Sequence, residues 1–373
     1  MEDQEIIKRM REQFGFYDQP RRFSREQLSA KVKDGDFLAS IDCSGMDLGG
    51  ADLTGCIFEK VSFNGANLRG ADLRESVFAK ADFGGADLQG ARMNQAVFQE
   101  ADLSKANLQD ASLGYAKLLE SRAEQIDMAR VDLSGGLVYR CKMNKANLAG
   151  ARLDRTTFTE SDLQSASFNQ VTCKQSLLVG LDFTGMTIDG ADFSQAILME
   201  TSFAGMDLRD MHFALAQMNQ ANLQGTNFSG ADLTQTSFVQ CDLSGAKLLR
   251  AKGHMALFID AKLYRALLGN AFLQQTSYQN ADLSQADFSA ADVRASVFHN
   301  AVCRAARFSG ADLTDCDFSH ADVSGADFSR ARLLRAKLHR ITEEKTIWSG
   351  SDRKAAFGDD PERVEGEEWR PVF

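Results

Sequence analysis

Seven cysteines carry the most versatile chemistry in this chain, because thiolates bind metal ions and form disulfides. Zinc sites need cysteines in close pairs such as Cys-x-x-Cys, or cysteines near histidines, and neither spacing occurs. The positions instead form two groups separated by multiples of five: Cys43, Cys173 and Cys303, and Cys56, Cys141, Cys241 and Cys316. We therefore predict small buried hydrophobic residues. Free thiols in this number suit a reducing compartment and predict a cytoplasmic localisation.

Histidines and glycine-rich spacings are the remaining candidates for catalysis. The five histidines, His212, His254, His299, His320 and His339, share no spacing with a partner acid or nucleophile, although His299 and His339 are related by a multiple of 20. The Gly-x-x-x-x-Gly spacing of a phosphate-binding loop occurs at Gly65 and at Gly185, but alanine follows where lysine should stand. We predict no enzyme activity, no cofactor and no metal site.

A five-residue register accounts for these spacings. From Leu48 to Leu338 every fifth residue is a core residue, with Ala123 and Gly253 alone lacking a sizeable side chain. A small residue, usually alanine, stands two positions before each of these centres. The unit reads A-[D/N]-[L/F]-x-x, as in Ala281-Asp282-Leu283-Ser284-Gln285. A period of five fits neither a helix nor a strand, and a fixed period indicates a repeat array.

This unit resembles the pentapeptide-repeat family over residues 41–340. The resemblance implies an all-β solenoid, a right-handed quadrilateral β-helix in which four pentads form each coil of about 20 residues, giving about 15 coils. The centre and the small residue before it point inward, and the other three point outward. The three prolines, Pro20, Pro361 and Pro371, lie outside the repeats, as a ladder of hydrogen bonds between coils requires.

The two ends differ from the repeats. Residues 1–40 are expected to form a helical N-terminal cap, with one helix over 3–13 and another that starts at Ser24, forms a capping box with Gln27 and ends at Lys33. A separate docking role for this segment stays open. Residues 341–373 read as an acidic C-terminal tail that is either mobile or folded back. A bulge, bend or small loop is expected at 119–128 and at 249–268.

Net charge bears on the choice of partner. Residues 1–40 are balanced and residues 341–373 carry −4, so −6 of the total −10 falls on residues 41–340. An acidic chain is a poor ligand for nucleic acid, and we predict no direct binding. Some proteins of the resembled family mimic DNA and bind topoisomerases, which requires a dense negative surface, whereas lysine and arginine are interleaved with aspartate here. The charged start argues against a signal peptide, and no apolar run could span a membrane.

Sorting the register by 20 separates four faces, of which one is apolar on its outside. We call the face whose centres run from Phe58 and Phe78 to Leu338 the apolar face. Just before its centres, eight of 15 residues are apolar, against three of 44 on the other faces; just after them the figures are six of 15 and three of 44. The predicted partner-binding residues are Leu137, Tyr139, Leu177, Val179, Ile197, Met199, Val239, Leu257 and Ile259.

Three explanations of the apolar face stay open: a protein partner or second copy covers it, the chain's own tail or N-terminal helices cover it, or it is simply the most regular sheet. The sequence predicts a non-catalytic scaffold that binds protein through this face. It also looks like the accessory pentapeptide proteins of bacterial type VI secretion. The alternative is a DNA mimic that binds or protects DNA gyrase or another topoisomerase, and a plain structural spacer is a third possibility.

Overall fold

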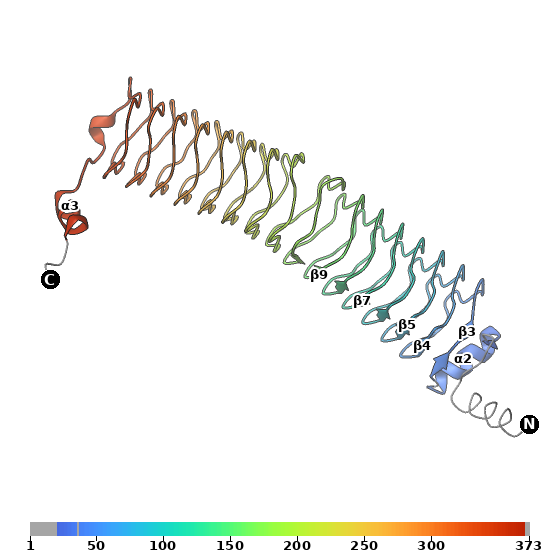
Figure 1. Cartoon of the computed structure of the whole chain (residues 1–373). Coiled ribbons are helices and arrows are strands. Elements are labelled where there is room, and N and C mark those ends of the chain that lie inside the picture. Colours follow the sequence, from blue (N-terminus) through green and yellow to red (C-terminus); the bar gives the residue numbers. More distant parts are fainter. Residues whose placement is uncertain (1–20, 36, 370–373) are drawn as a thin grey trace, which may run out of the picture. The chain divides into compact units, whose positions relative to one another are not determined.

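The computed structural model describes residues 21–35 and 37–369, so the helix expected over 3–13 lies outside the described residues (Figure 1). The chain divides into two units, Met1–Asp192 and Phe193–Phe373. The strands are β1 (Arg21–Arg22), β2 (Leu38–Ala39), β3 (Ile41–Asp42), β4 (Ile57–Glu59), β5 (Val77–Ala79), β6 (Val97–Gln99), β7 (Lys117–Leu119), β8 (Leu137–Tyr139), β9 (Thr157–Thr159) and β10 (Leu177–Leu178). The helices are α2 (Arg25–Lys33), η1 (Arg353–Ala355) and α3 (Pro361–Glu368).

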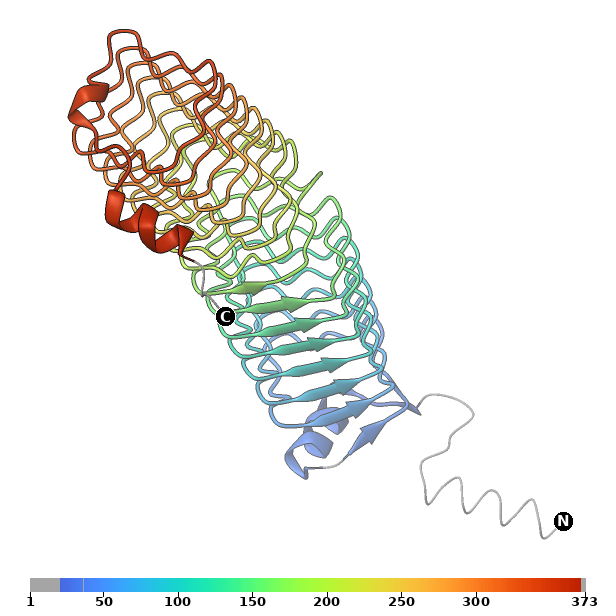
Figure 2. The same ribbon diagram turned by 60° about the vertical axis from the view of Figure 1, so that its left-hand side comes forward.

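Each unit is a β-solenoid whose rungs are 20 residues long. Parallel bridges join a residue to the one 20 positions later, as in Asp52↔Asp72 of unit 1 and Asp282↔Val302 of unit 2. In unit 1, strands β4 to β10 stack in sequence order, with Phe58 opposite Phe78 and Val77 opposite Val97 (Figure 2). The rung length predicted from the five-residue register is confirmed. Residues that share a remainder therefore align in columns within each unit.

The pentad motif follows from the needs of the backbone N–H groups, as the unit that begins at Ala281 shows. Ala281 donates to the preceding centre, Asp282 to the rung before, and Leu283 and Gln285 to the rung after, at 2.7–3.0 Å. The Ser284 N–H finds no backbone acceptor there and donates to the Asp282 Oδ1 at 3.0 Å. Because buried or half-buried N–H groups must be satisfied, aspartate or asparagine before the centre completes each unit.

The centres and small residues form the core. In unit 2 a column of five aromatic centres, expected from the sequence, stacks from Phe238 through Phe258, Tyr278 and Phe298 to Phe318, with ring centroids 4.4–5.0 Å apart. All seven cysteines are buried free thiols. Burial raises the pKa of Cys43 to about 12 and that of Cys141 to about 11, so these thiols stay protonated and act as small apolar residues.

The N-terminal segment begins the ladder earlier than the predicted start at residue 41. Strand β1 pairs in parallel with β3, placing Arg22 beside Asp42, and β2 pairs with β4. Helix α2 has the predicted capping box between Ser24 and Gln27, and its Leu28 is fully buried. A helix that buries an apolar residue at the open end of a solenoid shields exposed core and strand edges, which favours the capping role over separate docking.

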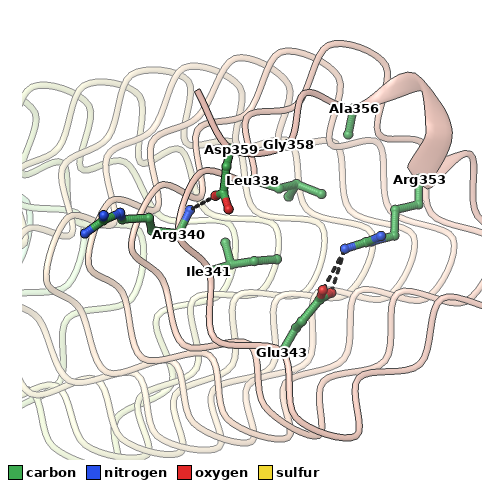
Figure 3. A pocket seen from close by; sticks show the side chains of 8 residues that line it. All are labelled: Leu338, Arg340, Ile341, Glu343, Arg353, Ala356, Gly358 and Asp359. Atoms are coloured by element: carbon green, nitrogen blue, oxygen red, sulfur yellow. Dashed lines mark hydrogen bonds and ion pairs between the residues drawn. The ribbon is translucent and has the colours of Figure 1, made fainter. Parts of the chain in front are cut away.

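The ladder also continues past the predicted boundary at residue 340, with bridges as far as Lys337↔Phe357. In this last rung the centre positions hold Glu343, Trp348, Arg353 and Gly358. The Arg353 guanidinium pairs with both Glu343 carboxylate oxygens at 2.7 and 2.8 Å, and the Trp348 Nε1–H donates to the same carboxylate (Figure 3). Trp348 in turn stacks on Phe328 at 4.5 Å. Polar centres therefore close the end of the apolar core.

A cavity of about 220 Å³ lies beside this ion pair, lined by the apolar Leu338 and Ile341 and by four charged residues, Arg340, Glu343, Arg353 and Asp359 (Figure 3). The charges on its wall are matched: Glu343 and Arg353 pair with each other, and the Asp359 carboxylate accepts the Arg340 N–H at 2.6 Å. The cavity is thus part of the polar closure of unit 2 and offers a ligand little unpaired charge.

The bulge, bend or loop expected at the two weak centres was wrong. Bridges run unbroken through Arg122 and through Lys252, the residues that precede Ala123 and Gly253. At Gly253 an added Cβ would lie 2.7 Å from the Leu273 side chain of the following rung, so Leu273 already fills the space. The division after Asp192 was not expected. Its sequence signal is the presence of large residues at positions that are usually small: Leu181, Met186, Met206 and Met211.

Candidate functional site

The predicted apolar face coincides with the regular sheet of unit 1. Leu137 and Tyr139 flank the buried Val138 in β8, and Leu177 and Val179 flank the buried Leu178 at β10. The bias toward apolar outward residues therefore does mark the most regular sheet, as one explanation proposed. That explanation accounts for the strands but does not remove the side chains from the surface.

In unit 2 the remaining predicted residues occupy equivalent columns. Ile197 and Leu257 stand before their centres, and Met199, Val239 and Ile259 stand after theirs. Leu257 is 38 % exposed, whereas the other eight predicted residues are half-buried, because neighbours one rung above and below cover part of each side chain. The exposed Met255 at the adjoining corner extends the apolar area of this rung.

Charged residues border the apolar columns in unit 1. The turn column beside them holds the ion pairs Lys80–Glu100, at 3.5 Å, and Arg140–Glu160, at 2.6 Å. The Arg140 guanidinium also lies 4.9 Å from the centre of the Tyr139 ring. An apolar centre with a charged rim and an aromatic residue stacked by arginine is the usual composition of a protein-binding surface.

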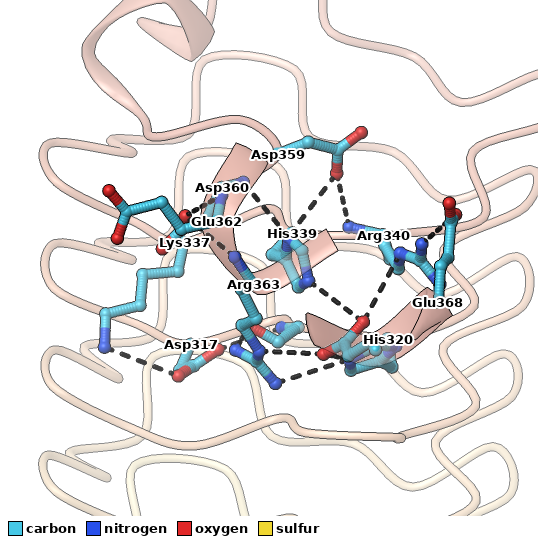
Figure 4. Close-up of polar contacts among 12 residues, drawn as sticks. Asp317, His320, Lys337, His339, Arg340, Asp359, Asp360, Glu362, Arg363 and Glu368 are labelled. Carbon is cyan, nitrogen blue, oxygen red and sulfur yellow. Dashed lines mark hydrogen bonds and ion pairs between the residues drawn. The ribbon is translucent and has the colours of Figure 1, made fainter. Parts of the chain in front are cut away.

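The outward columns of the same face turn polar toward the C-terminal end of unit 2, where helix α3 lies (Figure 4). The Glu367 carboxylate contacts His320 Nε2 at 3.1 Å and His339 Nε2 at 3.3 Å. Arg363 binds Glu367 at 2.9 Å and the Ser319 hydroxyl at 3.4 Å, and Arg340 pairs with Glu368. Among the described residues, α3 therefore covers the polar end of the face, while Leu257 stays exposed.

Three imidazoles form a column beneath this helix. The rings of His299 and His320, and of His320 and His339, pack edge to face with centroids 5.3 Å apart. His339 is 3 % exposed, and its Nδ1 accepts the Asp360 N–H at 3.1 Å. A neutral His339 therefore carries its proton on Nε2 and donates it to Glu367. Burial alone raises the pKa of Glu367, but hydrogen bonds from His339, Arg363 and His320 outweigh it and lower that pKa.

The nitrogen and oxygen atoms of His320, His339 and Glu367 lie within 4.8 Å of one another, which is a possible ligand set for a divalent metal. Two features do not fit a metal site. A metal-bound histidine donates its other N–H, whereas the second nitrogen of His339 faces the Asp360 N–H donor. Glu367 is already neutralised by Arg340 and Arg363. The cluster is a set of hydrogen bonds and ion pairs that fastens α3.

Sequence reasoning missed this cluster. Glu367 lies 28 residues from His339 and 47 from His320, and it belongs to no pentad. The only available signal was the alignment of His299 and His339 in one column, which has no meaning until an acidic partner is placed opposite it.

The remaining outer surface is charge-compensated. Asp72 contacts both Arg74, at 2.8 Å, and Arg92, at 2.7 Å, and the pair Arg130–Asp110 joins neighbouring rungs at 2.7 Å. Such pairs contribute little to stability each, but they cancel charge locally. This surface differs from the continuous negative charge of a DNA backbone.

No helix in the described part of the chain has the length and apolar character needed to cross a membrane. No curated protein matches the sequence. Among solved structures, the fluoroquinolone-resistance protein QnrB1 is 18% identical over 48% of this chain and 88% of its own, with a TM-score of 0.36. HetL, from the cyanobacterium Nostoc sp. strain PCC 7120, is a pentapeptide-repeat protein involved in heterocyst differentiation. It is 22% identical over 82% of this chain and 96% of its own, with a TM-score of 0.22.

A pentapeptide-repeat protein from the Arabidopsis thaliana thylakoid lumen is 26% identical over 40% of this chain and 72% of its own, with a TM-score of 0.14. These TM-scores are too low to support an inference about function. The profile of the pentapeptide repeats matches in eight copies, at residues 38–75, 76–114, 139–172, 176–211, 212–250, 256–294 and 296–333. Since these matches cover more than half of the sequence, this chain belongs to the pentapeptide-repeat family.

Proposed function

We propose that this chain is a non-catalytic, cytoplasmic scaffold, a right-handed quadrilateral β-helix of about 15 coils that binds a protein partner through its apolar face. The observation that carries the proposal is the outward pair Leu137 and Tyr139 on β8, set in an apolar column and bordered by ion pairs. Outward side chains from successive strands, about 4.8 Å apart, form a ribbon that suits an extended protein surface better than a small ligand.

The partner is either a different protein or a second copy of the chain, and the same substitutions separate the two. Leu137→Asp/Tyr139→Asp places two charges in the apolar columns, where an interface would desolvate them. The matched control is Tyr115→Asp, which adds charge at a residue of unit 1 that is 62 % exposed and lies outside the apolar face. Both variants should fold, because the substituted side chains are outside the core.

Light scattering on the purified proteins tests the second copy: a dimer of wild type and Tyr115→Asp that is a monomer in the double variant supports self-association. If wild type is a monomer, affinity capture is repeated with all three proteins. A protein retained by wild type and by Tyr115→Asp, but lost with the double variant, supports a foreign partner. The proposal fails if neither mass nor any captured protein depends on Leu137 and Tyr139.

A role as an accessory of bacterial type VI secretion stays a prediction that identification of such a partner would test. The alternative DNA-mimic function is disfavoured by the local charge compensation of Asp72 and Asp110. We expect the purified protein to leave gyrase supercoiling activity unchanged. Inhibition or protection of gyrase would reverse the order of the two proposals.

A further inference from the structure

We infer that the corner formed by Ser319, His320, His339 and Arg340 is a binding site for an acidic helical peptide, and that α3 occupies this site as a displaceable internal ligand. This site lies at the polar end of unit 2 and does not depend on the proposed partner-binding face. All four residues lie in successive rungs of one solenoid, so the site is preorganised by the ladder that holds those rungs.

The corner presents hydrogen-bond donors and positive charge toward α3. His339 donates through Nε2, Arg340 contacts both Glu367 and Glu368, and His320 lies 3.1 Å from Glu367 (Figure 4). Donors that converge on two adjacent carboxylates recognise glutamates on one turn of a helix. The site is thus specific for acidic side chains rather than for apolar ones.

The helix is held by these polar contacts alone. No residue of α3 is buried, and Val364 is its one half-buried apolar side chain. The helix has eight residues, including Gly366, and a helix of that length and composition is marginal in isolation. Exposed ion pairs contribute little each and weaken with salt. Helix α3 is therefore held loosely enough for a competing acidic helix to replace it.

Displacement would change the surface of unit 2 substantially. His339 is 3 % exposed while α3 is docked, and the Asp360 N–H and Glu367 that shield it both belong to the tail. Removal of the tail helix would expose His339, His320 and Arg340 together as a positively charged patch. In the docked state this patch is closed, so the acidic tail blocks the site until a competitor arrives.

The test uses full-length protein and a fluorescent synthetic peptide of residues 357–373. Glu367→Ala/Glu368→Ala removes the two carboxylates that contact the corner and leaves the corner intact. The control, Glu362→Ala/Glu365→Ala, removes the same charge from exposed positions of α3 that make no side-chain contact with the corner among the bonds found in the described residues. Hydrogen exchange of residues 361–369 reports release of the internal helix in each variant.

Fluorescence anisotropy should show the peptide binding the Glu367→Ala/Glu368→Ala protein at least about tenfold more tightly than wild type or the control, since no internal competitor remains. Adding His320→Ala and His339→Ala should abolish this binding, and raising sodium chloride from about 50 to about 500 mM should weaken it several-fold. Equal binding to all full-length proteins, or no binding to the released variant, would overturn the inference.

Discussion

The hydroxyl of Tyr278 offers a sharp test of how the core is built. Tyr278 is fully buried in the aromatic column of unit 2, and its hydroxyl oxygen has no hydrogen-bond partner among the described residues. Its ring stacks on Phe258 at 5.0 Å and on Phe298 at 4.8 Å, with interplanar angles of 5° and 14°. Replacement of Tyr278 by phenylalanine keeps both stacking contacts and removes only the unpaired hydroxyl.

Burial of a hydroxyl without a hydrogen bond costs about 1–3 kcal/mol in protein mutational data. Tyr278→Phe should therefore raise the free energy of unfolding of unit 2 by about 1–3 kcal/mol. The matched reverse change, Phe258→Tyr, introduces a second hydroxyl one rung away and should lower it by a similar amount. Tyr278→Leu should be destabilising because both stacked contacts are lost.

Urea unfolding followed by far-ultraviolet circular dichroism gives the overall stability of each variant. Solenoids can unfold in parts, so hydrogen exchange of the amides around residues 258–298 provides the local value. An unfolding midpoint for Tyr278→Phe equal to or below that of wild type would refute the reasoning. It would mean that the hydroxyl finds a partner, such as a bound water, and that the column is not a purely apolar stack.

The other predictions concern the ends of the molecule and the pentad itself. Arg353→Leu should leave the Glu343 carboxylate unpaired and destabilise the last rung, whereas Arg353→Leu with Glu343→Leu should create an apolar end that associates with other copies; both follow from thermal unfolding and light scattering. Because hydrogen bonds lower the pKa of Glu367, its contribution to tail docking is present above about pH 4.3 and is lost as the pH falls through the lowered pKa. Hydrogen exchange of α3 between about pH 5 and 3 should show this release, and unchanged protection would contradict it. Asp282→Ala should cost about 0.5–1.5 kcal/mol by leaving the Ser284 N–H unpaired, while Asp282→Asn should be nearly neutral; equal losses would exclude the side-chain acceptor.

Much of the fold could be predicted from local rules that repeat. The five-residue register identified the core centres, the buried cysteines and the 20-residue rungs, because a repeating core requires the same residue size at each equivalent position. The capping box of Ser24 and Gln27 depends on residues three apart, so it was also readable. The outer columns of the apolar face followed from the register, although the sequence overstated their exposure.

The parts that could not be predicted depend on contacts the repeat does not encode. The Glu343–Arg353 pair occupies centre positions, but its polarity made the last rung read as a tail. The filling of the Gly253 gap required the conformation of Leu273 in the following rung. Both cases show that a vacant or polar centre is compatible with the ladder when a neighbouring side chain compensates for it.

The amino-acid sequence by itself determined the period, the direction in which each side chain points and the apolar nature of one face, because these are properties of each pentad and its neighbours in the chain. The tertiary structure alone decided that Glu367 meets His320 and His339, and hence which end of that face is covered. The physical reason is distance along the chain: a tail outside the register can dock against any rung, and only folding selects the one whose donors match its carboxylates.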